Sequence, residues 1–190
     1  MSLIRCEMDK FLKEFEKDNQ RRVKASRDAL KVEAWRLRIW LRSDIRSGIS
    51  GNKRFSPLSI IGRFFSKHKD RPLYKLALPV RYDVVGRDPF HIEIGFTGKV
   101  SASWKRIAER QQEGQGVSVT EGVRRFWMLT GAQLKKKKRT EAKFFFLKPS
   151  TMNLKIPKRE IIDPFWDAHK GDVMRNIKEH YERKLRGERI

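Results

Sequence analysis

The side chains best suited to binding chemistry are arginines that share a predicted helix with tryptophans. The residues concerned are Arg36, Arg38, Arg42, Arg46, Trp35 and Trp40. Guanidinium groups bind phosphate and aromatic rings stack on bases, so this combination is typical of nucleic-acid interfaces. A second interpretation places the tryptophans in the core and the arginines on a solvated face. The spacing of Trp35, Ile39 and Trp40, which puts them on one side of a helix, favours the second interpretation.

A run of five cations is the second basic feature, and it comprises Lys135, Lys136, Lys137, Lys138 and Arg139. Its charge has to be solvated or neutralised by a partner. A solvated loop is the commoner explanation, and contact with an acidic protein or with nucleic acid is the alternative. The whole chain holds 45 Lys+Arg against 23 Asp+Glu, a net charge of +22, and such a field attracts acidic partners.

Groups that would support catalysis or metal binding are spaced unfavourably. The four histidines do not pair at a metal-ligand spacing, and Cys6 is the single cysteine. The sequence contains no Gly-rich phosphate loop, no Gly-x-Ser-x-Gly and no His-Glu-x-x-His. We therefore expect no metal, no cofactor and no enzymatic activity.

Length and composition predict one domain with a modest core. The chain has 190 residues, of which 38% are hydrophobic, 36% charged and 11% aromatic. This length suffices for a real core. No apolar run approaches the ~18 residues of a membrane span, and the N-terminus lacks the apolar segment that secretion requires. We expect a protein that stays in the compartment where it is made and has no membrane partner.

The first part of the chain predicts a long helix that projects as an arm. From Glu7 to Ile49 there is no Pro or Gly before Gly48, and the pattern fits one helix or two that are broken near Asn19. An apolar stripe at helical spacing comprises Met8, Phe11, Leu12 and Phe15. A helix of ~40 residues would reach ~60 Å, longer than a small domain is wide. We therefore assign residues 1–49 to a helical arm whose stripe contacts a partner, and residues 50–190 to an α+β domain.

The remaining periodicities predict a small antiparallel sheet of two hairpins covered by helices. The expected hairpins span 78–96 and 144–156, the expected internal helices follow Ser101 and Thr120, and the last helix starts at an N-cap, Asp163. Gly131 is expected to end the helix that follows Thr120. The last helix carries an apolar stripe of Val173, Ile177, Tyr181 and Leu185, which makes it amphipathic. The fold class expected is α+β.

The segment before the last helix carries a family resemblance. Ile156-Pro157-Lys158-Arg159, followed by Glu160 and two isoleucines, leads into the amphipathic helix. This resembles the C-terminal signature of phage tail-completion proteins, also described as virion morphogenesis or minor tail proteins. The long charged N-terminal helix and the segment 107–114 are similar to that family as well. Glu160 stands where those proteins often have a second proline.

The resemblance implies a structural subunit of the phage virion. Such a subunit would assemble into a ring, expected to be sixfold, at the head-proximal end of the tail and would join tail to head. Its partners would be neighbouring neck and tail proteins, such as the tail terminator, the tail tube and head-closure proteins, with DNA in the channel as a further contact. It would reach the tail neck after assembly in the host cytoplasm.

Two other classes of function remain open. One is a non-catalytic nucleic-acid-binding protein that uses Arg36, Arg38, Arg42 and the run from Lys135 to Arg139 on phosphates. The other is a small basic toxin or nuclease, which no motif supports.

Overall fold

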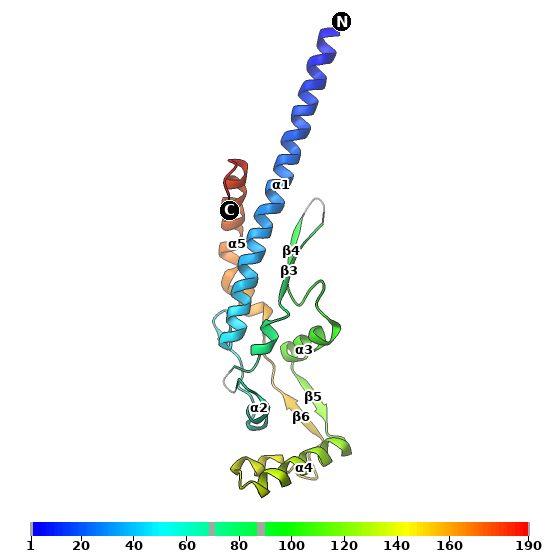
Figure 1. The fold of residues 1–190 in the computed structure, drawn as a ribbon, viewed down its shortest axis with the longest axis vertical. Coiled ribbons are helices and arrows are strands. Elements are labelled where there is room, and N and C mark those ends of the chain that lie inside the picture. The colour runs from blue at the N-terminus through cyan, green and yellow to red at the C-terminus, as the bar shows by residue number, and fades with distance from the viewer. Residues whose placement is uncertain (1, 69–70, 87–89, 190) are drawn as a thin grey trace.

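One helix, α1 (Ser2–Ser47), forms the axis of the molecule (Figure 1). The computed structural model describes residues 2–68, 71–86 and 90–189, and the side chains of all of these except 2–15, 60, 61 and 65. The other elements in chain order are β1 (Ile49–Ser50), β2 (Lys53–Arg54), α2 (Ile60–Phe65), η1 (Tyr74–Ala77), β3 (Arg81–Val85), β4 (His91–Gly95), α3 (Ala102–Glu113), β5 (Gln115–Ser118), α4 (Glu121–Lys136), η2 (Thr140–Phe145), β6 (Asn153–Ile156) and α5 (Ile162–Leu185). The expected α+β class, with long N-terminal and C-terminal helices, is confirmed.

Helix α1 is continuous, without a break near Asn19, and ends at Gly48, whose φ of 80° the left-handed region allows at little cost for glycine. Its first half projects past the rest of the molecule, as expected (Figure 1). Its second half supplies a buried stripe at four-residue spacing, made of Ala25, Ala29, Glu33, Leu37, Leu41 and Ile45. Within the predicted arm of residues 1–49, this second half therefore belongs to the main core.

The interpretation of Trp35 as a core residue is wrong. Its side chain is 53% exposed, and Ile39, one turn further on, is 40% exposed. Only Trp40 of the three packs against the main core, where it is half-buried. The physical reason is the stripe at four-residue spacing, because the β3–β4 ribbon and α5 cover that side of α1 and leave the Trp35 side open.

Three separate two-stranded antiparallel ribbons replace a single small sheet. The first predicted hairpin is confirmed as β3 paired with β4, in a register that runs from Arg81 opposite Gly95 to Val85 opposite His91. Strand β3 begins just after Pro79, as a residue without an N–H requires. Residues 87–89 of the expected turn lie outside the described residues.

The second predicted hairpin is wrong. Phe144 and Phe145 belong to the 3-10 helix η2, and β6 pairs with β5, with Gln115 opposite Ile156 and Ser118 opposite Asn153. Alternation along β6 indicates a strand but not its partner, which here lies across α4 and η2 in the chain. Phe145 is fully buried while its two neighbours are exposed, and the 3-10 helix η2 allows this because successive side chains on it point in different directions.

Two helix boundaries differ from expectation. Thr120 caps α4 as predicted, since its hydroxyl accepts from the Val123 N–H, but the helix runs through Gly131 to Lys136. Helix α5 begins at Ile162 and not after Asp163, which lies in its first turn. The Ser50 hydroxyl donates to the Ile161 carbonyl and thereby holds the start of α5 against the turn after β1.

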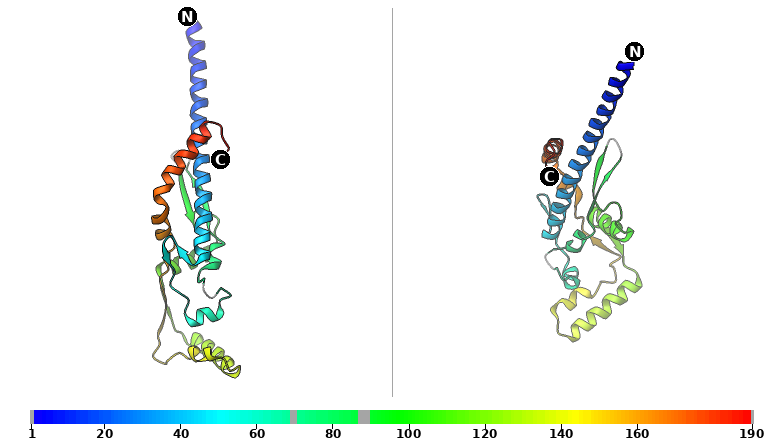
Figure 2. Two further views of the ribbon diagram at one scale, coloured as in Figure 1. Left: turned by 90° about the vertical axis from the view of Figure 1, so that its left-hand side faces the viewer. Right: turned by 45° about the horizontal axis from the view of Figure 1, so that its top comes forward.

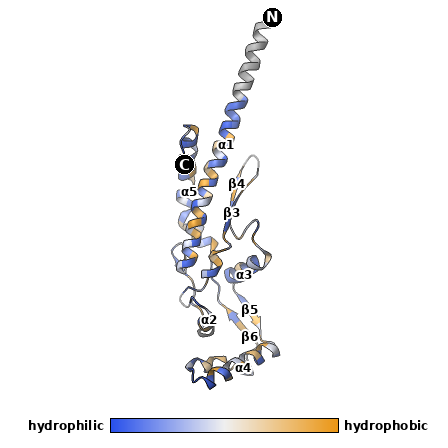
Figure 3. Cartoon of the chain, viewed as in Figure 1, coloured by the Kyte–Doolittle hydropathy of each residue, from blue (hydrophilic) through white to orange (hydrophobic). Residues whose placement is uncertain are grey.

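The chain forms two apolar clusters, and the elements that carry the second one lie at the end of the molecule opposite the projecting half of α1 (Figure 2). The main core lies among α1, α5, η1 and the β3–β4 ribbon. The second cluster, which we call the distal lobe, is formed by α2, α4 and η2 around Phe145. The β5–β6 ribbon connects the distal lobe to the body (Figure 1). Hydropathic colouring shows apolar residues on α4 as well as between α1 and α5 (Figure 3).

Candidate functional surfaces

The projecting part of α1 is the first candidate surface. Helix α5 ends beside α1 at Arg21, whose guanidinium donates to the Leu185 carbonyl. Residues 16–20, which precede this contact, are exposed, so this stretch of α1 is not covered by the body. The backbone of Met8, Phe11, Leu12 and Phe15 lies in α1, while their side chains lie outside the described residues. From residue 2 to residue 20 this arm extends for about 28 Å at 1.5 Å per residue.

An apolar groove lies along the body beside α1. It has a volume of about 440 Å³ and is lined only by apolar side chains from α1, β4 and α5. Leu37 and Leu41 line it from α1, and Ile94 does so from β4. Two of its lining side chains on α5 are strongly exposed, Trp166 at 48% and Met174 at 73%.

Charge is divided unevenly between the arm and the body. Residues 1–18 hold four Lys+Arg against five Asp+Glu, a net charge of −1. Because the whole chain carries +22, the remaining residues carry +23. On α5 the exposed residues Lys170 and Lys178 lie one turn on either side of Met174 and so flank the groove. The net charge of the arm is therefore opposite in sign to that of the rest of the chain.

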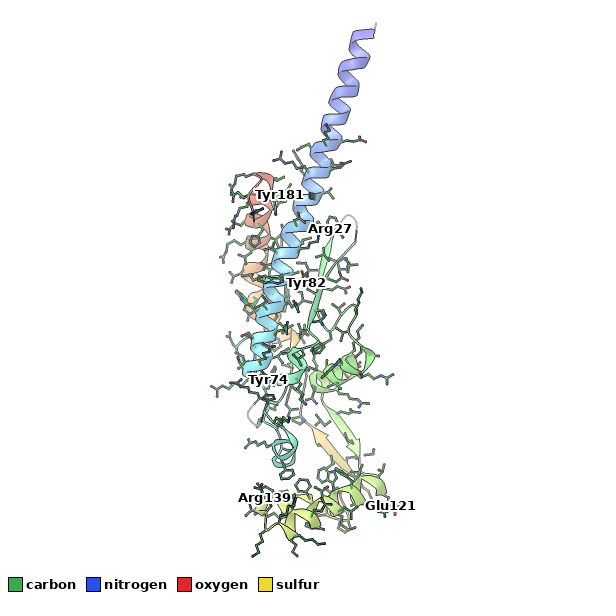
Figure 4. All side chains as sticks on the ribbon, in the orientation of Figure 1. Arg27, Tyr74, Tyr82, Glu121, Arg139 and Tyr181 are labelled. Atoms are coloured by element: carbon green, nitrogen blue, oxygen red, sulfur yellow. The ribbon has the colours of Figure 1, made fainter. Side chains whose placement is uncertain are left out.

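An arginine cluster lies where α1 contacts η1 and β3, close to Tyr74, which Figure 4 labels. Arg38, Arg42 and Arg46 succeed one another at one-turn spacing on α1, and Arg81 joins them from β3. The Nε of Arg38 donates to the Val80 carbonyl at 3.2 Å, and an Nη of Arg81 lies 3.5 Å from the same oxygen. The Arg46 guanidinium lies 5.9 Å from the centre of the Tyr74 ring.

The cluster is electrostatically unbalanced. Burial lowers the pKa of Arg42 below its ordinary value, and repulsion from Arg38, Arg46 and Arg81 lowers it further. Within the described part of the chain, none of the four forms an ion pair with a carboxylate. The expectation that these arginines form a fully solvated face is wrong for Arg38, Arg42 and Arg46, which are half-buried.

Arg36 lies outside this cluster. It pairs with the buried carboxylate of Glu33, to which its Nε donates at 2.8 Å, and its guanidinium lies 4.3 Å from the centre of the Trp40 ring. Glu33 and Trp40 therefore account for the position of the Arg36 side chain without any further partner. Sequence reasoning connected Arg36 with Arg38 and Arg42 because all three share α1, and it missed Arg81 because no local pattern relates that residue to α1.

The five-cation run is part of the end of α4 and not only a loop. Lys135 and Lys136 form the last turn, Lys137 is the C-cap, and the N–H of Arg139 donates back to the Leu134 carbonyl. All five side chains are exposed, and Arg139 marks this end of the distal lobe in Figure 4. Cations at a helix C-terminus are favourable with the helix dipole, so the fold alone explains part of the run.

The Ile156-Pro157-Lys158-Arg159 segment has a definite structural role. Arg159 is 4% exposed, and its guanidinium donates to the carbonyls of Ser56 and Pro57 and to Oε1 of Gln111, at 2.8, 3.1 and 2.6 Å. Its own N–H donates to the Gln111 carbonyl at 2.7 Å. Arg159 therefore joins the loop before α2, the end of α3 and the approach to α5.

Glu160 also has a local role. Its carboxylate forms ion pairs with Lys53 at 3.1 Å and with Lys158 at 2.7 Å. Hydrogen bonds from these ammonium groups lower the pKa of Glu160 below its ordinary value. Ile156 ends β6 and is half-buried, whereas Pro157 is exposed.

The outer face of the distal lobe is unusually apolar for a surface. Phe126, Met128 and Leu129 of α4 are each exposed by more than half, and Met152 is 68% exposed. The opposite face of α4 packs on the lobe, where Trp127 and Phe145 have ring centres 6.0 Å apart. An apolar patch of this kind marks a contact surface in many proteins.

The described residues include no group of three His, Cys, Asp or Glu side chains that could hold a metal ion. No helix among them is long and apolar enough to cross a membrane. Comparison with protein-family models, curated proteins and solved structures found no match.

Proposed function

We propose that this protein is a structural subunit of a phage tail neck, a tail-completion protein that forms a ring at the head-proximal end of the tail and joins tail to head. The observation that carries the proposal is the unsupported arm of α1 beside a groove and a body of opposite charge. The described side chains of this arm, residues 16–20, are exposed, and a projecting helix of this kind is suited to contact with a neighbouring subunit. The resemblance around Arg159 supplies the particular assembly.

The arm of each subunit would lie in the groove of the next. It cannot fold back into its own groove, because α1 is continuous from Ser2 to Ser47 and lines that groove with its second half. The stripe Met8, Phe11, Leu12 and Phe15 supplies apolar residues for an apolar groove, and the acidic residues around it meet Lys178 of α5, since Lys170 is paired with Asp167. This contact joins different surfaces on the two copies, and such contacts close into rings when the rotation per subunit allows.

The proposed partners follow from this place in the virion. Besides copies of itself, the ring would contact the tail terminator, the tail tube and head-closure proteins. The apolar outer face of the distal lobe, far from the arm, is available for one of these contacts. The protein would act without catalysis and without a cofactor.

Imaging of phage particles tests the proposed assembly. Antibody fragments raised against the distal lobe should decorate a ring between head and tail in electron micrographs of purified virions. Lysates of a phage that lacks the gene should contain heads and tails that are not joined. Decoration of any other part of the particle, or normal particles without the gene, would exclude a role in the neck.

Cross-linking tests the contact between arm and groove. Cys6 is the single cysteine and lies in the arm, so Met174→Cys adds a thiol beside the groove. A bismaleimide should then produce covalent oligomers larger than dimers. Met152→Cys is the matched control, because Met152 is 68% exposed but lies outside the groove. Oligomers with both variants would deny the groove a special role, and dimers of the unmodified chain would show that arms pair with arms.

A further inference from the structure

Arg42 is surrounded by like charge in a way that the free protein does not compensate. Arg38 and Arg46 lie one turn away on each side, and Arg81 approaches from β3. The Nε atoms of Arg42 and Arg46 are buried and, among the described residues, have no hydrogen-bond partner. Buried polar groups are nearly always hydrogen-bonded, so two orphaned donors of equal charge in one place indicate a missing acceptor.

Four guanidinium groups without a carboxylate partner among the described residues favour an acceptor with several oxygens and more than one negative charge. A guanidinium offers parallel N–H groups that match two oxygens of one anion. One carboxylate has two oxygens and a single charge, which is too little for the cluster. Phosphate groups meet both requirements, and Arg is the residue best suited to bind them.

The row formed by Arg38, Arg42 and Arg46 on α1 is also longer than a single phosphate. Successive arginines on α1 are separated by four residues, a rise of about 6 Å, so the three span about 12 Å along the helix. A chain of phosphates can follow such a row, whereas one inorganic phosphate cannot. Contacts to phosphate carry no sequence information, so a site that binds only the backbone should not distinguish base sequences.

We propose that Arg38, Arg42, Arg46 and Arg81 form a binding site for the phosphate backbone of nucleic acid, without preference for base sequence. The site is separate from the groove and the distal lobe. The inference does not depend on the tail-neck proposal, because binding is measured in solution without a virion. In a neck ring, the same site would meet DNA in the channel.

Fluorescence anisotropy with a labelled 20-base-pair duplex tests the site over a range of salt concentrations. Arg42→Gln/Arg46→Gln should weaken binding at least tenfold and reduce the slope of log K against log salt by about 1.8, since each lost phosphate contact contributes about 0.9. The control is Arg106→Gln/Arg110→Gln at exposed positions of α3, which removes the same charge from a helix that contributes nothing to the cluster. It should change affinity much less, and two duplexes of unrelated sequence should bind equally.

Thermal unfolding shows whether the variants act through folding. Removing like charges relieves repulsion, so the Arg42→Gln/Arg46→Gln protein should melt no lower than the unchanged protein. Addition of the duplex should raise the melting temperature of the unchanged protein more than that of the variant. Arg81→Gln, at an exposed strand position, provides a second variant that should also weaken binding.

Three results would overturn the inference. One is unchanged duplex affinity in both cluster variants. Another is an equal loss of duplex affinity in the control variant, which would mean that binding depends only on net charge. The third is binding of polyglutamate as tightly as the duplex with the same sensitivity to Arg42→Gln/Arg46→Gln, which would assign the cluster to an acidic protein.

Discussion

Arg159→Lys is the most informative single substitution in this chain, because it keeps the charge and removes the geometry. Arg159 is buried and has no carboxylate partner among the described residues; two carbonyls and one amide oxygen receive its hydrogen bonds. Burial lowers its pKa below the ordinary value, which shows that the charged form is desolvated. A lysine ammonium is a compact donor that cannot reach acceptors spread around a planar fork.

The magnitude follows from the acceptors that lose their donor. Hydrogen bonds to charged groups contribute about 1.5–3 kcal/mol each. If lysine keeps one acceptor of three, the free energy of unfolding falls by about 3 kcal/mol or more. With an m value of about 2 kcal/mol/M, the urea midpoint falls by about 1.5 M.

Urea unfolding followed by circular dichroism measures this shift. The matched control is Lys158→Ala at the neighbouring exposed residue, which should move the midpoint little because surface ion pairs contribute weakly. Gln111→Ala, which removes one acceptor, should give a urea midpoint between those of Arg159→Lys and Lys158→Ala. A midpoint for Arg159→Lys equal to that of the unchanged protein, with equal m values, would refute the structural role of the Arg159 hydrogen bonds.

Four further substitutions have defined outcomes. Gly131→Ala should destabilise the protein by about 1 kcal/mol despite a helix-propensity gain of about 1 kcal/mol, because its Cβ would lie 3.0 Å from Phe145 Cβ and overpacking costs about 1–3 kcal/mol. Gly171→Ala, with open space around it, should instead stabilise by up to about 1 kcal/mol in thermal unfolding, and the reverse order would contradict the packing of α4. Burial raises the pKa of Asp44, so the folded state binds its proton more tightly and stability falls as pH rises from the unfolded through the folded pKa. Asp44→Asn, which can still accept from the Gly51 N–H, should remove this decline from urea midpoints taken at several pH values, and an unchanged profile would exclude Asp44 as its source. Phe145→Ala should cost about 3–5 kcal/mol locally and abolish hydrogen-exchange protection in α4 and η2 but not in α1, whereas uniform loss of protection would show that the distal lobe and the main core unfold together.

Elements whose signals lie within a few residues were predicted well. The absence of Pro and Gly before Gly48 indicated the long helix, and alternation on both sides of a turn indicated the β3–β4 ribbon. Thr120 was recognised as an N-cap because its hydroxyl acts on a nearby N–H. Each of these depends on short-range hydrogen bonds and periodicity, which are properties of the local sequence.

The predicted helix end at Gly131 is wrong because the need for close packing between α4 and η2, and not a helix end, explains the glycine. Glycine commonly ends a helix, but Gly131 lies inside α4, where a side chain would collide with Phe145 and Phe146. The glycine serves close packing between α4 and η2. Nothing near it in the sequence indicates that use.

Some features of the candidate surfaces could also be predicted from the sequence, and others depend on tertiary packing. The row of arginines on α1 and the charge of the five-cation run are visible in the sequence, as is the stripe from Met8 to Phe15. Arg81 joins the cluster, and Arg36 leaves it for Glu33, only because β3 packs beside α1 and turns one side of that helix inward. Similarly, β6 pairs with β5 across the whole distal lobe. Helical periodicity assigns residues to a face of a helix, but which face is buried and which strands pair are decided by the burial of distant apolar groups, a property that only the folded chain possesses.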